Sequence, residues 1–369
     1  MPHNKVTVYL NETPEELETK HLAKRVYIYF TLLIDYISYG INYLISLILN
    51  NFFGHPKPSL LHTPTPTFHP VVLVTGTSAG IGRDVALTLA RKGYTVFAAV
   101  RKVEDFELLL QEFRDITVTN ENHGTLNCVL MDVTNCNDRQ RAYDTIRHAI
   151  GRDTPFVGLL NVAAAIIYLP VEVASDLAIH DTFETNLFGI IHLTKLFLPL
   201  LRESRGRVVN IGSMAAWNST SSMAIYSASK AALRALTHTW RQEVRSMGIN
   251  MILVEPGMID TRFTQKVHQD FQEFTGFSNS PYCEKLQNVN LRTLEIYEAQ
   301  FKIFGKFCDE AIDSAAPPGI VTDAILHALT SRFPKTTYYV GMDSKVLASL
   351  NWLLGERISE AIQARIFGF

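Results

Sequence analysis

The stretch Val71-Val-Leu-Val-Thr-Gly-Thr-Ser-Ala-Gly-Ile-Gly82 decides the fold of this chain. Its first five residues form an apolar run of the length of a buried strand, and a helix is predicted from about Ile81 to Lys92. The glycines between them allow a sharp turn in which the backbone can approach a pyrophosphate. The N-terminus of the helix then offers free N–H groups and a positive dipole end. The stretch therefore predicts a strand–turn–helix unit that binds a dinucleotide.

Downstream of this unit, apolar strands and helices alternate. Because the strands read as continuous apolar runs, they indicate parallel strands buried on both faces. This pattern predicts an α/β fold: a Rossmann-like, doubly wound parallel sheet with helices on both faces, spanning residues 71–369. The expected strands are 71–75, 95–100, 126–131, 156–161, 207–211, 250–254 and 338–340, and the clearest later helices are 179–202, 224–247 and 345–354.

The composition excludes several classes of protein. The 369 residues are 47% hydrophobic and 19% charged, which excludes global disorder. Lys plus Arg number 34 against 36 Asp plus Glu, so no basic field indicates nucleic-acid binding. The four cysteines lack Cys-x-x-Cys spacing, so they predict neither a disulfide framework nor a metal site, and they fit a reducing compartment.

The region before the first strand has three parts. Residues 1–25 are polar, residues 26–50 are apolar with Asp35 as the one charge, and residues 51–70 form a proline-rich linker. The apolar part approaches the length of about 20 residues that a membrane helix needs, so we expect a membrane anchor. Its polar residues form one helical stripe: Thr31, Asp35, Ser38, Asn42 and Ser46.

This stripe leaves three placements of the anchor open. A carboxylate at a bilayer centre costs about 2.5–3.5 kcal/mol, so the stripe should face protein, water or headgroups. The segment could span the membrane and pair through the stripe, or lie in the plane of the membrane surface. It could also be a helix buried against the same chain.

Seven motifs follow one another in the order typical of one enzyme family. They are Thr75-Gly76-x-x-x-Gly80-Ile-Gly82, Asp132-Val133, Asn161-Val-Ala-Ala164, Asn186, Ser213, Tyr226-x-x-x-Lys230 and Pro256-Gly257-x-Ile259-x-Thr261. The set resembles the classical short-chain dehydrogenases/reductases over roughly half of the chain. Val162 and Ala164 depart from the family, which has Asn and Gly there.

The resemblance implies a cofactor site built from these motifs. Asp132 would contact adenine, Lys230 would also hold the nicotinamide ribose, and Ile259 and Thr261 would hold the carboxamide or phosphate side. Asp132 could equally be the N-cap of the next helix. The full set expected to bind the cofactor is Thr75, Gly76, Ser78, Gly80, Ile81, Gly82, Arg101, Asp132, Val133, Asn161, Tyr226, Lys230, Pro256, Gly257, Ile259 and Thr261.

The end of the second strand predicts which dinucleotide binds. An acidic residue there would bind the ribose 2′-hydroxyl of NAD. The sequence instead reads Ala98-Ala-Val-Arg-Lys102, so two cations could meet a 2′-phosphate. We therefore expect NADP(H) in preference to NAD(H), unless Arg101 and Lys102 are only solvated residues at a helix start.

The expected catalytic residues are Asn186, Ser213, Tyr226 and Lys230. Tyr226 and Lys230 are four apart on a helix, so both side chains point the same way. A tyrosine pKa near 10 would be lowered by the lysine cation, which would let the phenol exchange a proton while hydride passes to or from nicotinamide. Ser213 would orient the substrate oxygen, and in the family the asparagine supports a water chain that reaches the lysine.

The substrate is expected to be lipophilic. Residues 263–316 correspond to the family's variable lid and are rich in aromatic residues, although those at helical spacing could simply be core. With the anchor and Tyr338-Tyr-Val-Gly341, the lid resembles the membrane-associated steroid and retinol dehydrogenase branch. The lid aromatics are Phe263, Phe271, Phe274, Phe277, Tyr282, Tyr297, Phe301, Phe304 and Phe307.

Two other functions stay open: a non-catalytic NADP(H)-binding sensor, and a sugar-nucleotide epimerase of the extended branch, whose Thr-Gly-x-x-Gly-x-x-Gly motif is missing here. We expect a homodimer on the endoplasmic reticulum membrane. Cations before the anchor favour a lumenal catalytic domain. The glycosylation acceptor Asn218-Ser-Thr220, beside Ser213, and the free cysteines favour the cytosolic side, which we prefer.

Overall fold

The computed structural model describes residues 14–53, 63–65, 67–117, 123–151, 154–262, 264–265, 286, 291–313, 315–354, 361 and 365. Seven parallel strands form one sheet in the order β3-β2-β1-β4-β5-β6-β7. The order reverses between β1 and β4, and ligands of such sheets bind at this reversal, outside the carboxyl ends of the strands. The strands are β1 (Val71–Thr75), β2 (Thr95–Val100), β3 (Thr125–Leu130), β4 (Phe156–Asn161), β5 (Arg207–Ile211), β6 (Asn250–Pro256) and β7 (Thr337–Val340).

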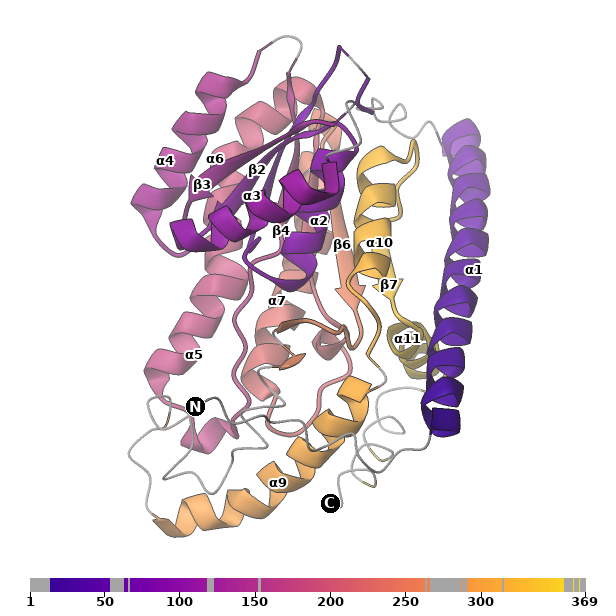
Figure 1. Ribbon diagram of the computed structural model, residues 1–369, viewed down its shortest axis with the longest axis vertical. Helices are drawn as coiled ribbons and strands as arrows, with labels where there is room; N and C mark the ends of the chain where they lie inside the picture. Colours follow the sequence, from indigo (N-terminus) through magenta and orange to yellow (C-terminus); the bar gives the residue numbers. More distant parts are fainter. Residues whose placement is uncertain are drawn as a thin grey trace.

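Helices cover both faces of the sheet, as the sequence predicted (Figure 1). Residues of β1 alternate between the two layers: Val72 and Val74 pack toward α2, α3 and α10, while Val71 and Leu73 pack toward α4 and α6. The helices are α2 (Gly80–Arg91), α3 (Val103–Thr117), α4 (Cys136–Ala149), α5 (Asp176–Phe183), α6 (Gly189–Ser204), α7 (Ala224–Val244), α9 (Leu291–Asp313), α10 (Gly319–Thr330) and α11 (Met342–Leu354).

The helix predicted over 179–202 is interrupted. A π-helical turn over Glu184–Phe188 separates α5 from α6. Such a turn inserts one extra residue and changes the direction in which side chains point, and it occurs often at functional sites. Asn186 lies in this turn and is fully buried.

The N-terminal helix α1 (Pro14–Phe53) runs along the side of the domain formed by α10, β7 and α11 (Figure 1). It is longer than the predicted anchor and extends into the residues assigned to the linker. Within it, Arg25–Ser46 is long and apolar enough to cross a membrane, and only 6% of its most apolar window is buried.

The polar stripe of α1 faces the same chain. The Lys345 ammonium lies 2.7 Å from the Asp35 carboxylate, and the Asn42 amide donates to the Phe333 carbonyl at 2.9 Å. Lys335 donates to the Ser38 hydroxyl. Asp35, Ser38 and Asn42 of the stripe are therefore paired with residues 333–345, whereas the remaining faces of α1 expose apolar side chains.

Candidate active site

The glycine-rich turn has the geometry that a pyrophosphate cradle requires. Gly76 and Gly80 have φ of +70° and +57°, which favours glycine. A Cβ on Gly82 would lie 2.2 Å from the Gly76 carbonyl oxygen, so only glycine fits there. The N-cap residue Ala79 offers no side-chain hydrogen bond to the first turn of α2, and that turn carries no acidic residue. These amides can therefore receive an anion, and the turn, which also holds Ser78 and Ile81, fits a dinucleotide.

Two threonines fix this turn to its neighbours. The Thr75 hydroxyl accepts hydrogen bonds from the amides of Val162 and Ala163 at 2.9 and 3.0 Å. The Thr77 hydroxyl donates to the Ala99 carbonyl at 3.0 Å. Thr75 thus lies beneath the expected cofactor site and shapes it. Thr77 was missed by the sequence analysis, although a threonine directly after the first glycine is a local signal for such a turn.

The end of β2 lies beside the glycine-rich turn, because the Thr77 amide donates to the Ala99 carbonyl. Arg101 and Lys102 follow β2, and both side chains are exposed. They are therefore available to a ligand that reaches this edge of the sheet.

Asp132 was considered as a helix N-cap, and that interpretation is wrong. The N-cap of α4 is Asn135, whose side chain accepts from the amides of Asn137 and Asp138. The Asp132 carboxylate instead accepts from the amide and hydroxyl of Thr134 at 2.9 and 2.7 Å. This local turn follows β3 and places Asp132, with the buried Val133, at the carboxyl edge of the sheet.

Asn161 ends β4 with its side chain turned into the interior. Its amide donates to the Asn210 side chain at 2.8 Å and to the Thr194 hydroxyl at 3.2 Å. Asn210 in turn donates to Thr237 on α7 at 2.9 Å. The Asn161 side chain therefore links β4, β5, α6 and α7 beneath the site.

Three of the four expected catalytic residues meet at the carboxyl ends of β5 and β6. The hydroxyls of Tyr226 and Ser213 are hydrogen-bonded. The Lys230 ammonium donates to the Ile211 carbonyl at 2.8 Å and lies 5.7 Å from the centre of the Tyr226 ring. Tyr226 and Lys230 are only 8% and 1% exposed.

The electrostatics of this cluster differ from the expectation. Burial raises the pKa of Tyr226 to about 12, and the hydrogen bond from Ser213 only partly opposes this rise. Burial lowers the pKa of Lys230 to about 8. In this structure desolvation therefore outweighs the attraction between ammonium and phenolate, and the phenol holds its proton at neutral pH.

Asn186 reaches the cluster from the π-helical turn. Its side chain exchanges hydrogen bonds with both backbone groups of Ala165, each at 2.8 Å, and donates to the Ser229 hydroxyl at 3.0 Å. Ser229 donates to the Tyr226 carbonyl at 2.7 Å. Asn186 therefore joins the loop after β4 to the helical turn that carries Tyr226 and Lys230.

The residues after β6 close the cofactor site from the other side. A Cβ on Gly80 would lie 3.0 Å from two side-chain carbons of Thr261, so Thr261 touches the glycine-rich turn. Ile259 is buried and pairs through its backbone with Ala316. The last motif, from Pro256 to Thr261, thus lies against the first motif.

Part of the aromatic lid is core. Phe301 and Phe304 of α9 are 0% and 1% exposed and pack in an apolar cluster with Tyr168 and Ile225. Tyr297 donates to the Glu172 carboxylate at 2.9 Å. Ile225, the residue before Tyr226, is a buried member of this cluster, so the cluster packs against the start of α7. Phe307 of α9 is partly buried and packs against the same cluster. The other five lid aromatics, Phe263, Phe271, Phe274, Phe277 and Tyr282, lie outside the described residues.

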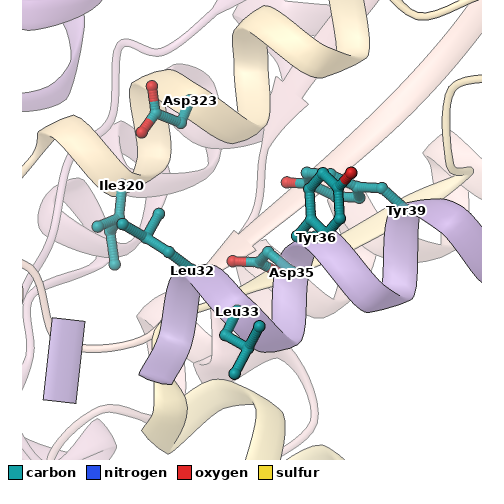
Figure 2. A pocket seen from close by; sticks show the side chains of 7 residues that line it. All are labelled: Leu32, Leu33, Asp35, Tyr36, Tyr39, Ile320 and Asp323. Atoms are coloured by element: carbon teal, nitrogen blue, oxygen red, sulfur yellow. The ribbon is translucent and has the colours of Figure 1, made fainter. Parts of the chain in front are cut away.

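A cavity of about 410 Å³ lies between α1 and α10 (Figure 2), and its lining contains none of Ser213, Tyr226 and Lys230. Its lining combines apolar side chains with the carboxylates of Asp35 and Asp323. It is lined by Leu32, Leu33, Asp35, Tyr36, Tyr39, Ile320 and Asp323. The cavity therefore marks a place where α1 and the domain are not in close contact, and it is not the site of the chemistry.

Comparisons with known proteins agree with this geometry. Residues 70–272 match the family model described as short chain dehydrogenase. The uncharacterized oxidoreductase YbbO of Escherichia coli strain K12 is 30% identical over 79% of this chain and 93% of its own length. The 17-beta-hydroxysteroid dehydrogenase type 6 of Rattus norvegicus is 28% identical over 74% of this chain and 81% of its own length.

The fold also matches solved structures. A short-chain dehydrogenase/reductase from Burkholderia phymatum, solved in complex with NAD, has a TM-score of 0.60 and 20% identity, covering 78% of this chain and 93% of that chain. At this identity the likeness concerns the fold.

Proposed function

This chain belongs to the short-chain dehydrogenase family of NAD(P)-dependent oxidoreductases, and we propose that it interconverts a lipophilic ketone or aldehyde and the corresponding alcohol with NADP(H). One observation carries the proposal: the phenol of Tyr226, bonded to Ser213 and one turn before Lys230, lies at the edge of the sheet that also holds the glycine-rich turn. An acid/base group and a dinucleotide cradle thus share one edge.

Bound nicotinamide would supply or accept the hydride. The residues of this chain manage the proton and the position of the substrate oxygen. The Tyr226 hydroxyl, protonated at neutral pH, can donate to a carbonyl oxygen that is gaining negative charge, while the Ser213 hydroxyl holds the same oxygen. Lys230, with Ile211 as its partner, places a positive charge behind the phenol and stabilises it as it loses its proton.

The preference for NADP(H) rests on Arg101 and Lys102. Both side chains are exposed and directly follow β2. The ribose 2′ position of a dinucleotide bound at the glycine-rich turn would lie near this end of β2. A guanidinium can form charge-assisted hydrogen bonds with such a phosphate, and it offers no acceptor for a ribose 2′-hydroxyl.

The lipophilic substrate class is supported by the apolar cluster at the start of α7. Its interior, with Ile225 and Phe304, is filled core, but Met223 and Phe307 at its edge are only partly buried. A substrate whose carbonyl meets Tyr226 would place its carbon skeleton against such partly buried apolar side chains. The steroid dehydrogenase among the relatives fits the same class of substrate.

The proposed placement of α1 is parallel to the membrane surface, with its outward face in the lipid. The catalytic domain holds α1 from Tyr27 to Asn42, so a helix crossing the bilayer would carry Lys335 and Lys345 toward hydrocarbon, where each cation costs about 2.5–3.5 kcal/mol. An in-plane helix keeps these cations with the protein and buries only apolar side chains. The exposed apolar side chains include Val26, Tyr29, Phe30, Leu33, Tyr36, Ile37, Ile41, Leu44, Ile45 and Ile48.

The proposed membrane is that of the endoplasmic reticulum, with the catalytic domain on the cytosolic side. The glycosylation acceptor Asn218 lies in the turn after Ser213, where its backbone N–H donates to the Met214 carbonyl at 2.9 Å. A glycan at that position would crowd the catalytic cleft, which disfavours the lumenal side. Insensitivity of the mass of the cellular protein to glycosidase agrees with this orientation, and a glycan on Asn218 contradicts it.

Turnover with a panel of lipophilic ketones tests the proposed activity. We expect purified protein to oxidise NADPH with at least one ketone, and Tyr226→Phe to retain NADPH binding while losing turnover by about 10²–10⁴-fold, a loss much larger than any loss of affinity. Tight NADPH binding without turnover of any ketone would instead indicate a sensor. Turnover of a sugar nucleotide alone would indicate an epimerase.

Liposome flotation tests the placement of α1. Ile37 and Leu44 are 52% and 59% exposed on α1, and replacing both with lysine should abolish flotation. Leu108, which is 57% exposed on α3, provides the matched control, since Leu108→Lys should leave flotation unchanged. Equal flotation of the double variant and the wild type would refute the in-plane placement.

A further inference from the structure

We infer that Asp343, in the first turn of α11, is a positioning residue for the segment Pro256–Thr261, and that docking of α1 holds Asp343 in place. We call this segment the cofactor loop. The inference rests on the proposed function for the identity of the ligand that the loop receives, and on contacts within the chain for everything else.

The Asp343 carboxylate lies directly against the cofactor loop. The Met258 amide donates to Asp343 Oδ2 at 2.6 Å, a short bond to an ionisable acceptor. A Cβ on Gly257 would lie 2.1 Å from both carboxylate oxygens, so a side chain at that position would displace Asp343. Gly257 is thus required by the close approach of the carboxylate, which a sequence motif alone does not explain.

The backbone on either side of Asp343 reinforces this contact. The Gly257 amide donates to the Val340 carbonyl at 2.8 Å, and Gly341, with a φ of +94°, turns the chain from β7 into α11. The Ser344 hydroxyl donates to the Glu255 carbonyl at 3.0 Å. The turn after β7 therefore holds consecutive residues of the cofactor loop and of the strand before it.

Burial of the Asp343 carboxylate costs free energy that its contact with the cofactor loop partly offsets. Its Oδ1 is buried and has no hydrogen-bond partner among the described residues. Burial raises the pKa of this carboxyl, and the amides of Met258 and Ser344 oppose that rise. A buried carboxylate with one unpaired oxygen destabilises the fold. We attribute its presence here to its hydrogen bond with the cofactor loop.

The same turn is held from the opposite side by α1. The Met342 amide donates to the Tyr27 hydroxyl at 2.9 Å. Lys345 lies 2.7 Å from the Asp35 carboxylate and donates to the Thr31 carbonyl at 3.2 Å. Asp343 thus lies between two residues that are both bonded to α1, so release of α1 would free the turn that carries the carboxylate.

The arrangement connects the membrane helix to the cofactor site through one helical turn. When α1 is docked, Asp343 holds the Met258 amide and the loop is ordered before the dinucleotide arrives, which lowers the entropic cost of binding. When α1 is released, the loop loses this support. NADP(H) affinity should therefore depend on the docking of a helix that does not touch the ligand.

Hydrogen exchange of residues 256–261 in cofactor-free protein tests the role of Asp343, with the dissociation constant of NADPH as a second readout. We expect Asp343→Ala to speed exchange of the Met258 amide by about tenfold or more and to weaken NADPH binding by about tenfold. Asp343→Asn retains a side-chain oxygen acceptor, so it should keep most of the slow exchange of the Met258 amide and most of the NADPH affinity. Unchanged exchange in Asp343→Ala, or no rescue by Asp343→Asn, would overturn the positioning role.

Two variants of the α1 interface test the coupling. Lys345→Met removes the bonds to Asp35 and to the Thr31 carbonyl and leaves only the bond between Met342 and Tyr27 to hold this turn against α1. It should therefore speed exchange in the cofactor loop and weaken NADPH binding. Asn42→Ala removes a bond of the same interface to Phe333, away from α11, and should change neither. Equal effects of the two variants would overturn the coupling. Because exchange needs neither cofactor nor carbonyl substrate, failure of the proposed activity would leave this result interpretable.

Discussion

Replacing Lys230, the lysine of the proposed catalytic pair, should stabilise the protein at neutral pH while removing the proposed activity. Burial lowers the pKa of Lys230 from its ordinary 10.5 to about 8, which corresponds to about 3 kcal/mol against the buried ammonium. Lys230→Met removes this charge and keeps an apolar side chain of similar length. It also removes the hydrogen bond to the Ile211 carbonyl, worth about 1.5–3 kcal/mol for a charged donor. We therefore expect Lys230→Met to be more stable than the wild type at pH 7, by about 1 kcal/mol.

The pH dependence gives this prediction its sign. Between about pH 8 and pH 10.5 the unfolded chain keeps a proton on Lys230 that the folded protein has lost, so the wild type gains stability as the pH rises through this window. Below pH 8 both states carry the proton, and the penalty is fully present. The stability advantage of the variant should therefore shrink from pH 7 and change sign by pH 10, because the penalty regained by the wild type exceeds the difference at pH 7.

Urea denaturation of both proteins at several pH values measures this difference, and taking the difference cancels the titration of the buried tyrosines. Turnover with a ketone substrate measures the loss of activity. A variant that is less stable than the wild type at pH 7 would refute the reasoning. So would a stability difference that does not change with pH.

Arg101→Asp should lower the preference for NADP(H) over NAD(H) by about 10–100-fold, because it replaces a hydrogen-bond donor to the 2′-phosphate with an acceptor for the ribose 2′-hydroxyl. The ratio of the kcat/KM values for the two cofactors measures this preference, and an unchanged ratio argues against the 2′-phosphate site. Phe304→Ala should destabilise the protein by about 3–5 kcal/mol, since Phe304 is 1% exposed and packs 5.7 Å from the Tyr168 ring; a loss below 1 kcal/mol in urea denaturation would contradict its place in the core. Glu255→Gln should slow turnover more than it weakens NADPH binding, because the buried Glu255 joins Arg234 of α7 to the Trp217 indole in the turn after Ser213. Turnover and the dissociation constant of NADPH measure the two effects, and equal effects would contradict a role confined to the turn after Ser213.

The electrostatic state of the catalytic pair was outside the reach of sequence patterns. Spacing on a helix predicted that Tyr226 and Lys230 lie on one side, and the 5.7 Å between ammonium and ring agrees. Whether a nearby ammonium or desolvation controls a pKa depends on how many atoms surround the pair in three dimensions. In the structure both groups are buried, and burial is the main cause of the raised pKa of Tyr226 and the lowered pKa of Lys230.

The course of the backbone near Asn186 was also beyond sequence patterns. The apolar periodicity of 179–202 predicted one continuous helix, because a single inserted residue hardly disturbs the pattern. Within the π-helical turn, Asn186 is held by both backbone groups of Ala165, in the loop after β4. Such a contact is visible only once the chain is folded.

The sequence by itself determined the α/β alternation, the glycine-rich turn and the order of the site motifs, because each depends on residues close together in the chain. The tertiary structure alone decided what the polar stripe of α1 meets. Asp35 pairs with Lys345 from the other end of the chain, so the stripe lies against protein and the apolar faces are turned outward. A helix of this composition is compatible with several surroundings, and only the packing of distant residues selects among them.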